Sequence, residues 1–348
     1  LVNTGNKISY VVTGVNPYWT GALGSEWSTA TLASPKNWAL SASQATDFLA
    51  NDAVLFDDRA TTMTVSIAAN VSPNIVSFNN SIKNFTLQGG GGIATGSLTK
   101  AGAGVLTIAT TNTYGGGTTL YEGGLKVGTN GALGSGPLTL RGGTLSSSSA
   151  TARSLTNAVF VQGNITLGDP ATAGTLNFSA SVDLGAATRE LAIASDVVVA
   201  GVVANGGLIK AGSGTLTLSG SNTYAGGTVL TAGTLAVNSP TSLGDASGAL
   251  TFAGNSTILY KESFLILRNF SIATGVFATL DSNGFSLTQT SVISGDGGLI
   301  KAGAGTFTLT GTNLYTGGTT VSGGTLAVSG GSAIPDTGVV SLANTPGV

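Results

Sequence analysis

A long repeat that aligns without gaps is the feature that most constrains the fold of this chain. Its three copies run from Ser97 to Val127, from Gly207 to Val237 and from Gly298 to Val328. Short apolar and threonine runs follow a series of glycines: Gly96, Gly117, Gly136, Gly207, Gly227, Gly248, Gly298, Gly318 and Gly338. Within each successive group of three, these glycines recur about every 20 residues. That period is typical of a solenoid rung, which buries its apolar face only by stacking on its neighbours.

Within a rung the residue types alternate with a period of two. In the run from Thr215 to Leu218, the two leucines face one side of a strand and the two threonines face the other. Threonine and valine favour strands, glycine permits the turns between them, and no segment has a helical period. The sequence therefore predicts an all-β fold, a single parallel β-helix (β-solenoid), with Leu216, Leu218, Leu235 and Val237 facing the core.

The spacing of the repeats indicates insertion by whole rungs. The repeats carry a lysine at the same place, at Lys100, Lys210 and Lys301. The two spacings between these lysines differ by about one rung. We expect the segment Asp169–Ala187 to be the additional rung.

The first part of the chain differs from the regular repeats. It holds all three tryptophans, Trp19, Trp27 and Trp38. The exposed core at the end of a solenoid needs a cap, and bulky aromatic side chains suit that role. We therefore divide the chain into an N-terminal cap region, 1–95, and a regular β-helix, 96–348, with the three tryptophans as the possible cap.

Composition excludes several classes of protein. Glycine supplies 54 of the 348 residues, and charged residues are only 8%, whereas roughly 25% is usual in soluble domains. Histidine and cysteine are absent. Metal or haem sites built on those residues, Ser-His-Asp or Cys-His catalysis and disulfide scaffolds are therefore excluded. We expect no cofactor.

Charge and hydropathy restrict the partners. The 13 basic and 15 acidic residues give a net charge of −2, which argues against the dense basic surface that binds nucleic acid. The longest apolar run, around Val197–Ala204, is far shorter than the ~18 residues of a membrane-spanning helix. The chain starts at Leu1 without a signal-like segment, so we expect an excised part of a longer product, and the lack of cysteine fits export.

The segment GGLIKAGSGTLTLSGSNTYAGGTVLTAGTLAV, which ends at Val237, resembles the autotransporter-associated β-strand repeat, also called the passenger-associated transport repeat. The opening of the chain, with Tyr18-Trp19-Thr20-Gly21 and Asn37-Trp38, is similar to that of large bacterial surface proteins that carry this repeat. The resemblance implies a secreted, right-handed parallel β-helix on the outer surface of a Gram-negative-type bacterium, whose stacked repeats assist export and folding. It implies no catalytic residues.

Two groups near the start of the chain are candidate binding sites. Asp52, Asp57 and Asp58 could hold calcium or act as a carboxylate pair, or they could form a solvated turn with an Arg59 ion pair. The three tryptophans could stack on a sugar ring, or they could form the packed cap described above. We favour the structural interpretation of both groups.

The repeats also place three polar residue types at equivalent positions. They are Lys100, Lys210 and Lys301, then Asn112, Asn222 and Asn313, then Tyr114, Tyr224 and Tyr315. The lysines could form an intramolecular crosslink to an asparagine, but we favour lysines at strand ends that keep a sheet edge soluble. For the asparagines we favour a turn in which the amide bonds local backbone.

An enzyme is the remote alternative. β-Helix enzymes that degrade acidic polysaccharides cluster their acids on consecutive rungs. The acids after residue 96 are scattered, at Glu122, Asp169, Asp183, Glu190, Asp196, Asp245, Glu262, Asp281, Asp296 and Asp336. The sequence therefore predicts a non-catalytic structural protein.

Two structural roles remain open: a subunit of a self-assembling surface filament or sheath, and a monomeric autotransporter-type passenger that acts as an adhesin or stalk. A rung that begins at Gly338 and stops at Val348 without a polar cap favours the filament. The strand-like segment Leu1–Val15 would bridge to a neighbour, so that copies join head to tail into a homopolymer. The adhesin would instead bind a cell-surface, host or matrix ligand.

Overall fold

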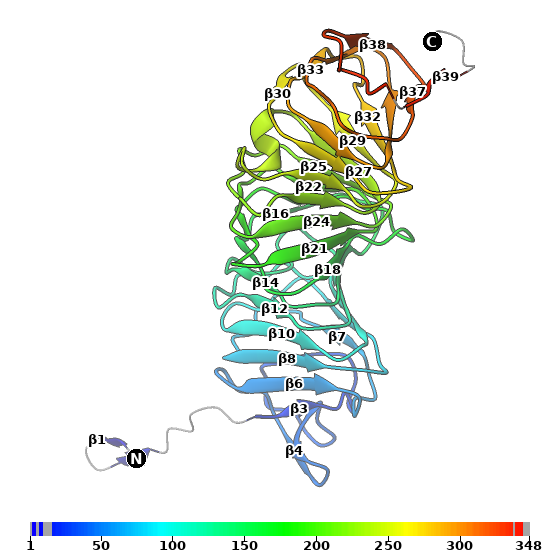
Figure 1. Cartoon of the computed structure of the whole chain (residues 1–348). Helices are drawn as coiled ribbons and strands as arrows, with labels where there is room; N and C mark the ends of the chain where they lie inside the picture. Colours follow the sequence, from blue (N-terminus) through cyan, green and yellow to red (C-terminus); the bar gives the residue numbers. More distant parts are fainter. Residues whose placement is uncertain (1, 5–6, 10–15, 337, 344–348) are drawn as a thin grey trace. The chain divides into compact units, whose positions relative to one another are not determined.

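The computed structural model describes residues 2–4, 7–9, 16–336 and 338–343. The chain divides into two compact units, 1–148 and 149–348, and each is a stack of short strands (Figure 1). An antiparallel hairpin of β1 (Val2–Thr4) and β2 (Lys7–Ser9) begins the chain. The rest of the predicted bridging segment, at 1, 5–6 and 10–15, lies outside the described residues.

The strands of the first unit form two columns, in which successive rungs pair in parallel. The first column contains β3 (Tyr18–Trp19), β6 (Ala53–Asp57), β8 (Ile75–Asn79), β10 (Ser97–Ala101), β12 (Thr118–Leu120) and β14 (Leu138–Leu140), with β4 (Trp38–Ser41) and β5 (Gln44–Thr46) added antiparallel beside β3. The second column contains β7 (Thr64–Ser66), β9 (Phe85–Gln88), β11 (Val105–Ile108), β13 (Gly124–Val127) and β15 (Thr144–Ser147).

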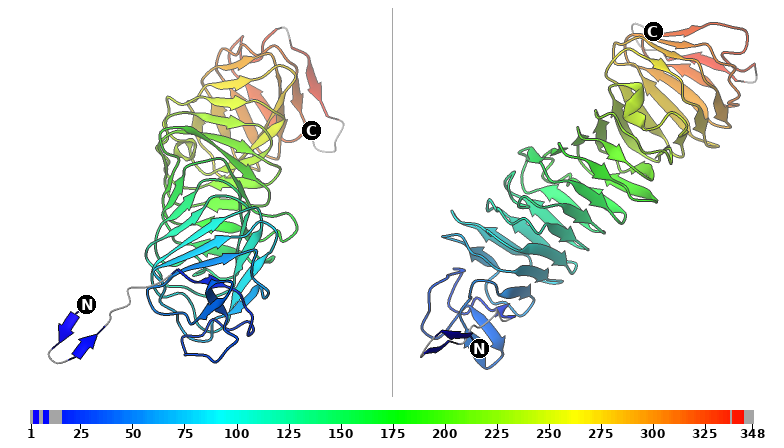
Figure 2. Two further views of the ribbon diagram at one scale, coloured as in Figure 1. Left: turned by 90° about the horizontal axis from the view of Figure 1, so that it is seen from below. Right: turned by 90° about the vertical axis from the view of Figure 1, so that its left-hand side faces the viewer.

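The second unit contains strands of four parallel columns, seen from two further sides in Figure 2. The longest, here called the ten-stranded column, contains β16 (Arg153–Leu155), β19 (Leu176–Phe178), β22 (Val197–Val199), β25 (Thr215–Leu218), β27 (Gly233–Val237), β29 (Ser256–Tyr260), β32 (Phe277–Asp281), β35 (Gly298–Ala302), β37 (Thr319–Val321) and β39 (Val340–Leu342). A second contains β18 (Ile165–Leu167), β21 (Thr188–Ile193), β24 (Gly207–Ala211), β26 (Thr228–Leu230), β28 (Leu250–Phe252), β31 (Phe270–Ile272) and β34 (Ile293–Gly295). The other two are β17 (Val159–Val161), β20 (Val182–Asp183) and β23 (Val203–Ala204), and β30 (Leu265–Ile266), β33 (Leu287–Gln289), β36 (Thr306–Leu309) and β38 (Thr325–Val328).

The predicted fold class, an all-β parallel solenoid, is confirmed in both units. In the part of the chain that the structure describes, the only helical segment is a single 3-10 turn, η1 (Pro240–Leu243). No described helix is therefore long and apolar enough to cross a bilayer.

Apolar ladders form the core of the second unit. Leu216 pairs with Leu235, and Leu235 pairs with Ile258 on the next rung. All three side chains are fully buried, as are Leu218 and Val237. The predicted inward orientation of Leu216, Leu218, Leu235 and Val237 is therefore confirmed, and each side chain is covered by rungs before and after its own.

The rungs vary in length without losing register. Leu98 pairs with Thr118 and Thr118 with Leu138, so this part of the first unit uses about 20 residues per rung. A longer rung separates Ile165 from its partner Leu191. The whole of the segment predicted as an additional rung, 169–187, lies in this interval, where it supplies β19 and β20.

The second and third repeats occupy different faces of the second unit. Lys210 lies on β24, and four steps of pairing lead up its column to Gly295 on β34. Lys301 instead lies on β35 in the ten-stranded column, where Leu280 is its partner. The chain between these two lysines therefore makes four full rungs and then continues to the next face of the solenoid. The periodicity of the sequence does not reveal this change of face.

We expect Leu216→Asp to unfold the second unit, because it places an unpaired carboxylate inside an apolar ladder at a cost of several kcal/mol, on the order of 4. Thr217→Asp, on the outward side of the same strand, is the matched control and should melt near the wild-type temperature. Thermal unfolding followed by circular dichroism measures both. Equal melting of the two variants would contradict the assigned orientation.

Candidate functional site

The repeat lysines lie inside the solenoid. Lys100 lies between Phe78 and Leu120 in an inward-facing ladder. Lys100, Lys210 and Lys301 are each 0% exposed. The interpretation of these lysines as exposed residues that keep a sheet edge soluble is therefore wrong, because the aliphatic stem occupies the place of an apolar side chain.

Each lysine ammonium donates hydrogen bonds to three backbone carbonyls. One carbonyl belongs to the last residue of its own strand, one to the glycine that follows the strand, and one to the next rung. The acceptors are Ala101, Gly102 and Glu122 for Lys100 (2.7, 2.6 and 3.4 Å), Ala211, Gly212 and Ala232 for Lys210 (3.0, 2.7 and 3.0 Å), and Ala302, Gly303 and Gly323 for Lys301 (2.7, 2.8 and 2.9 Å). Three donors thus meet three acceptors, which is the full capacity of an ammonium group. We call this arrangement the carbonyl cage.

Glycines of the next rung leave room for the cage. Gly123 and Gly233 have φ of +72° and +67°, and a Cβ on either would lie 2.8 Å from the lysine Nζ. Only a residue without a side chain combines that backbone conformation with so close an approach.

Burial changes the titration of the cage lysines. Desolvation lowers the pKa of Lys100 and of Lys210 to about 8, and it lowers the pKa of Lys301 as well. Glu122, whose carboxylate accepts the N–H of Gly102 at 2.9 Å, partly offsets this effect at Lys100. At neutral pH the ammonium form therefore still predominates in the first two cages.

The repeat asparagines connect three consecutive rungs. The side-chain oxygen of Asn222 accepts the N–H of Val203 at 2.7 Å, and its amide donates to the carbonyl of Ser242 at 2.6 Å. The equivalent contacts join Asn112 to Ile93 and Ala132, and Asn313 to Ile293 and Ala333. The expected turn with local backbone bonds is wrong, since the partners lie one rung before and one rung after. The alternative of a lysine–asparagine crosslink is also wrong, because each group bonds to backbone elsewhere.

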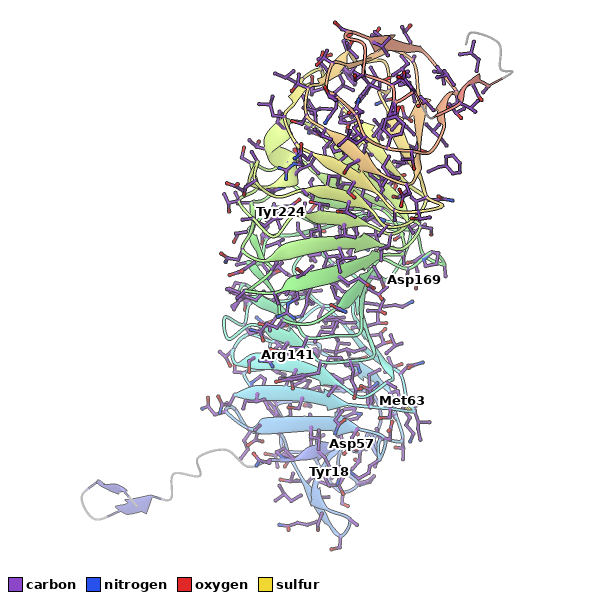
Figure 3. All side chains as sticks on the ribbon, in the orientation of Figure 1. Tyr18, Asp57, Met63, Arg141, Asp169 and Tyr224 are labelled. Atoms are coloured by element: carbon purple, nitrogen blue, oxygen red, sulfur yellow. The ribbon has the colours of Figure 1, made fainter. Side chains whose placement is uncertain are left out.

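The repeat tyrosines are buried beside a threonine four residues later. The hydroxyl pairs are Tyr114 with Thr118 at 2.7 Å, Tyr224 with Thr228 at 2.8 Å, and Tyr315 with Thr319 at 2.6 Å. Burial raises the pKa of Tyr224 to about 12, and Figure 3 marks this residue in the second unit. The sequence analysis missed the threonines, although the same spacing in all three repeats is a signal that identifies them.

The three tryptophans form a packed aromatic cluster. Trp19, Trp27 and Trp38 are at most 2% exposed. The ring centroids of Trp27 and Trp38 lie 5.3 Å apart, and both lie within 5.4 Å of the ring centroid of Phe56. Phe56 stacks on Phe78 of the next rung at 4.4 Å. A sugar-stacking platform needs exposed rings, so that interpretation of the tryptophans is wrong.

The three acids near the start of the chain serve separate roles. Asp52 is buried and accepts the N–H of Leu49 at 2.8 Å. Asp57 forms an ion pair with Arg59 at 2.6 Å, and Asp58 accepts backbone N–H groups of residues 81–83. These hydrogen bonds lower the pKa of Asp58. Across 2–4, 7–9, 16–336 and 338–343, no group of three or more acidic, histidine or cysteine side chains is placed to hold a metal ion.

Several acids of the second unit bond to backbone N–H groups, two within their own turn and one on the next rung. Asp183 accepts the N–H of Gly185, Asp196 that of Thr215, and Asp281 that of Asn283, at 2.7, 3.1 and 2.8 Å. Each of these carboxylates thus has a structural partner in the backbone.

Comparison with known families finds the passenger-associated-transport-repeat at residues 98–127, 208–237 and 299–328. These segments contain the carbonyl cages, the tyrosine–threonine pairs and the bridging asparagines, whose backbone partners lie just outside the segments. No curated protein and no solved structure matches the chain. The repeats and the solenoid fit the passenger domain of an autotransporter.

We expect Lys210→Met to lower the free energy of unfolding by about 2 kcal/mol at pH 7, because it keeps the apolar stem and leaves three buried carbonyls without their charged donor. Lys261→Met, at an exposed position of the same unit, is the control and should change stability by less than about 0.5 kcal/mol. Chemical denaturation measures both.

The same wild-type and Lys210→Met pair tests the titration. Below about pH 8 the folded and unfolded chains both hold the Lys210 proton. Between about 8 and the ordinary value of 10.5 only the unfolded chain holds it, so the stability of the wild type rises relative to the variant. Loss of stability from buried tyrosines above pH 10 affects both proteins and cancels. A flat or falling difference would contradict a buried, desolvated ammonium.

Proposed function

We propose that this chain, which carries three passenger-associated transport repeats on a β-solenoid, is a non-catalytic passenger displayed outside a Gram-negative-type cell. The threefold repeat match on stacked parallel rungs is the observation that carries the proposal. A rung completes its core only when its neighbours are present, so folding outside the cell would advance rung by rung. The passenger then serves as a structural element.

We propose that the chain is non-catalytic because its polar side chains have structural roles. The chain has no histidine or cysteine. The lysines, asparagines and tyrosines of the repeats are buried and bonded within the rungs. Three acids of the second unit bond to backbone N–H groups, two in turns and one on the next rung. These groups support a scaffold and not a reaction centre.

One surface supports a second, finer role, assembly of copies into a filament. Val328 on β38 is 54% exposed, whereas its equivalents Val127 and Val237 are fully buried by the following rung. Val340 and Leu342 on β39 are 53% and 70% exposed. A further parallel rung on this face would bury these side chains. In a filament another copy supplies that rung, and in a monomeric adhesin or stalk the polypeptide itself supplies it.

The location of the native protein tests the passenger proposal. We expect an antibody against this chain to label intact bacteria, and external protease to remove the label while a cytoplasmic marker survives. Detection only after lysis would contradict the proposal.

The non-catalytic part of the proposal has its own test. Cleavage of a polysaccharide by the purified protein, lost on substitution of one carboxylate, would contradict it.

Assembly is tested at the exposed rung. If copies associate there, Val340→Asp should abolish concentration-dependent oligomers, because it introduces a charge at the centre of an apolar contact. Ser341→Asp, on the outward row beside Thr320, is the matched control and should assemble normally. Light scattering coupled to size exclusion and electron microscopy follow the mass and the fibres. A wild-type protein that stays monomeric at high concentration supports the adhesin or stalk instead.

A further inference from the structure

An uncharged hollow lies on the outer surface of the ten-stranded column. It has a volume of about 380 Å³, and its walls include Thr234, Asn255, Thr257, Phe277, Thr279 and Ile300. We call it the threonine groove. No charged side chain is among the residues that form its walls.

A row of threonine hydroxyl groups lines the groove. Thr234 pairs with Thr257, and Thr257 pairs with Thr279, on three successive rungs. Their positions alternate with the buried Leu235, Ile258 and Leu280, so the threonines face outward. Strand stacking spaces the three hydroxyls at about 4.8 Å. The solenoid therefore presents a rigid, regular series of hydrogen-bonding groups.

An exposed aromatic ring flanks this row. Phe277 is 45% exposed, in contrast to the buried tryptophans. Its backbone N–H donates to the side-chain oxygen of Asn255 at 2.8 Å, which anchors the start of its strand. A Cβ on Gly298 of the next rung would lie 2.7 Å from Cε1 of Phe277. The glycine therefore lets the ring edge lie against the neighbouring strand, where it is supported as a platform.

The chemistry of the groove excludes most classes of ligand. The strands β27, β29 and β32 are paired on both edges, so a peptide has no free backbone to which it could add as a strand. Without charged side chains, the groove does not compensate an anionic polymer. With only Phe277 and Ile300 as large apolar walls, it offers a lipid chain little surface.

We propose that the threonine groove binds a neutral oligosaccharide, with one sugar ring stacked by its C–H face on Phe277 and with sugar hydroxyls bonded to the threonine row. Such a ligand combines an apolar face with many hydroxyls, as the groove combines a ring with a row of hydroxyls. The biological meaning of this inference rests on the proposed surface role. The binding itself does not, because the purified chain tests the groove independently of where the protein is displayed.

The test measures binding of cellopentaose and of penta-N-acetylchitopentaose to the full chain by ligand-observed NMR and calorimetry. An anionic hyaluronan oligosaccharide serves as a comparison. We expect at least one neutral oligosaccharide to bind and the anionic one to bind more weakly. Failure of both neutral probes at several millimolar, or preference for the anionic probe, would overturn the proposal.

Matched variants locate the site. Phe277→Ala should weaken binding about tenfold, and Thr257→Val, which removes one hydroxyl at nearly constant volume, about fivefold. Phe160→Ala removes another exposed ring, which is 39% exposed on β17, and Thr217→Val removes a hydroxyl outside the groove. Both controls should bind like the wild type, and all four should retain the wild-type melting temperature. Equal loss in the Phe160 and Phe277 variants would overturn the assignment to the groove.

Discussion

Stacking between rungs is the interaction on which the rest of this structure depends. A rung of two or three short strands has no second layer of its own to cover its apolar side chains. Leu216 is buried because Leu235 lies on one side of it and Val197 on the other. The same stacking pairs the strand backbones, so hydrophobic burial and hydrogen bonding both increase with each added rung.

Stacking also explains the polar residues that the repeats bring into the core. The turns at the rung corners leave carbonyls and N–H groups that no strand partner satisfies, and such groups are costly to bury unpaired. The ammonium of Lys210 bonds three of these carbonyls, and the amide of Asn222 bonds the rungs before and after its own. The most regular polar residues of the repeats thus hold neighbouring corners together.

The second and third repeats lie on different faces of the second unit, which shows that the core residues and the outward residues vary independently. Lys301 continues the ladder of Leu216, Leu235, Ile258 and Leu280. The same buried motif therefore recurs while the outward residues around it change. This freedom on the outer side is what allows one column to carry both an exposed phenylalanine and a row of threonines, without disturbing the burial that holds the rungs together.

The sequence by itself determined the fold class, the approximate rung length and the inward positions of Leu216 and Leu235, because a period of two within a period near 20 has few structural solutions. It also marked the residues of the repeats, but it did not predict what they do. Lysine is rarely buried, so exposure was expected for Lys100, and the asparagine was assigned a local turn. Only the tertiary structure decided these points, because some of the carbonyls that bond Lys210 and Asn222 belong to another rung. Residues one rung apart are far apart along the chain, so their contact cannot be inferred from the sequence.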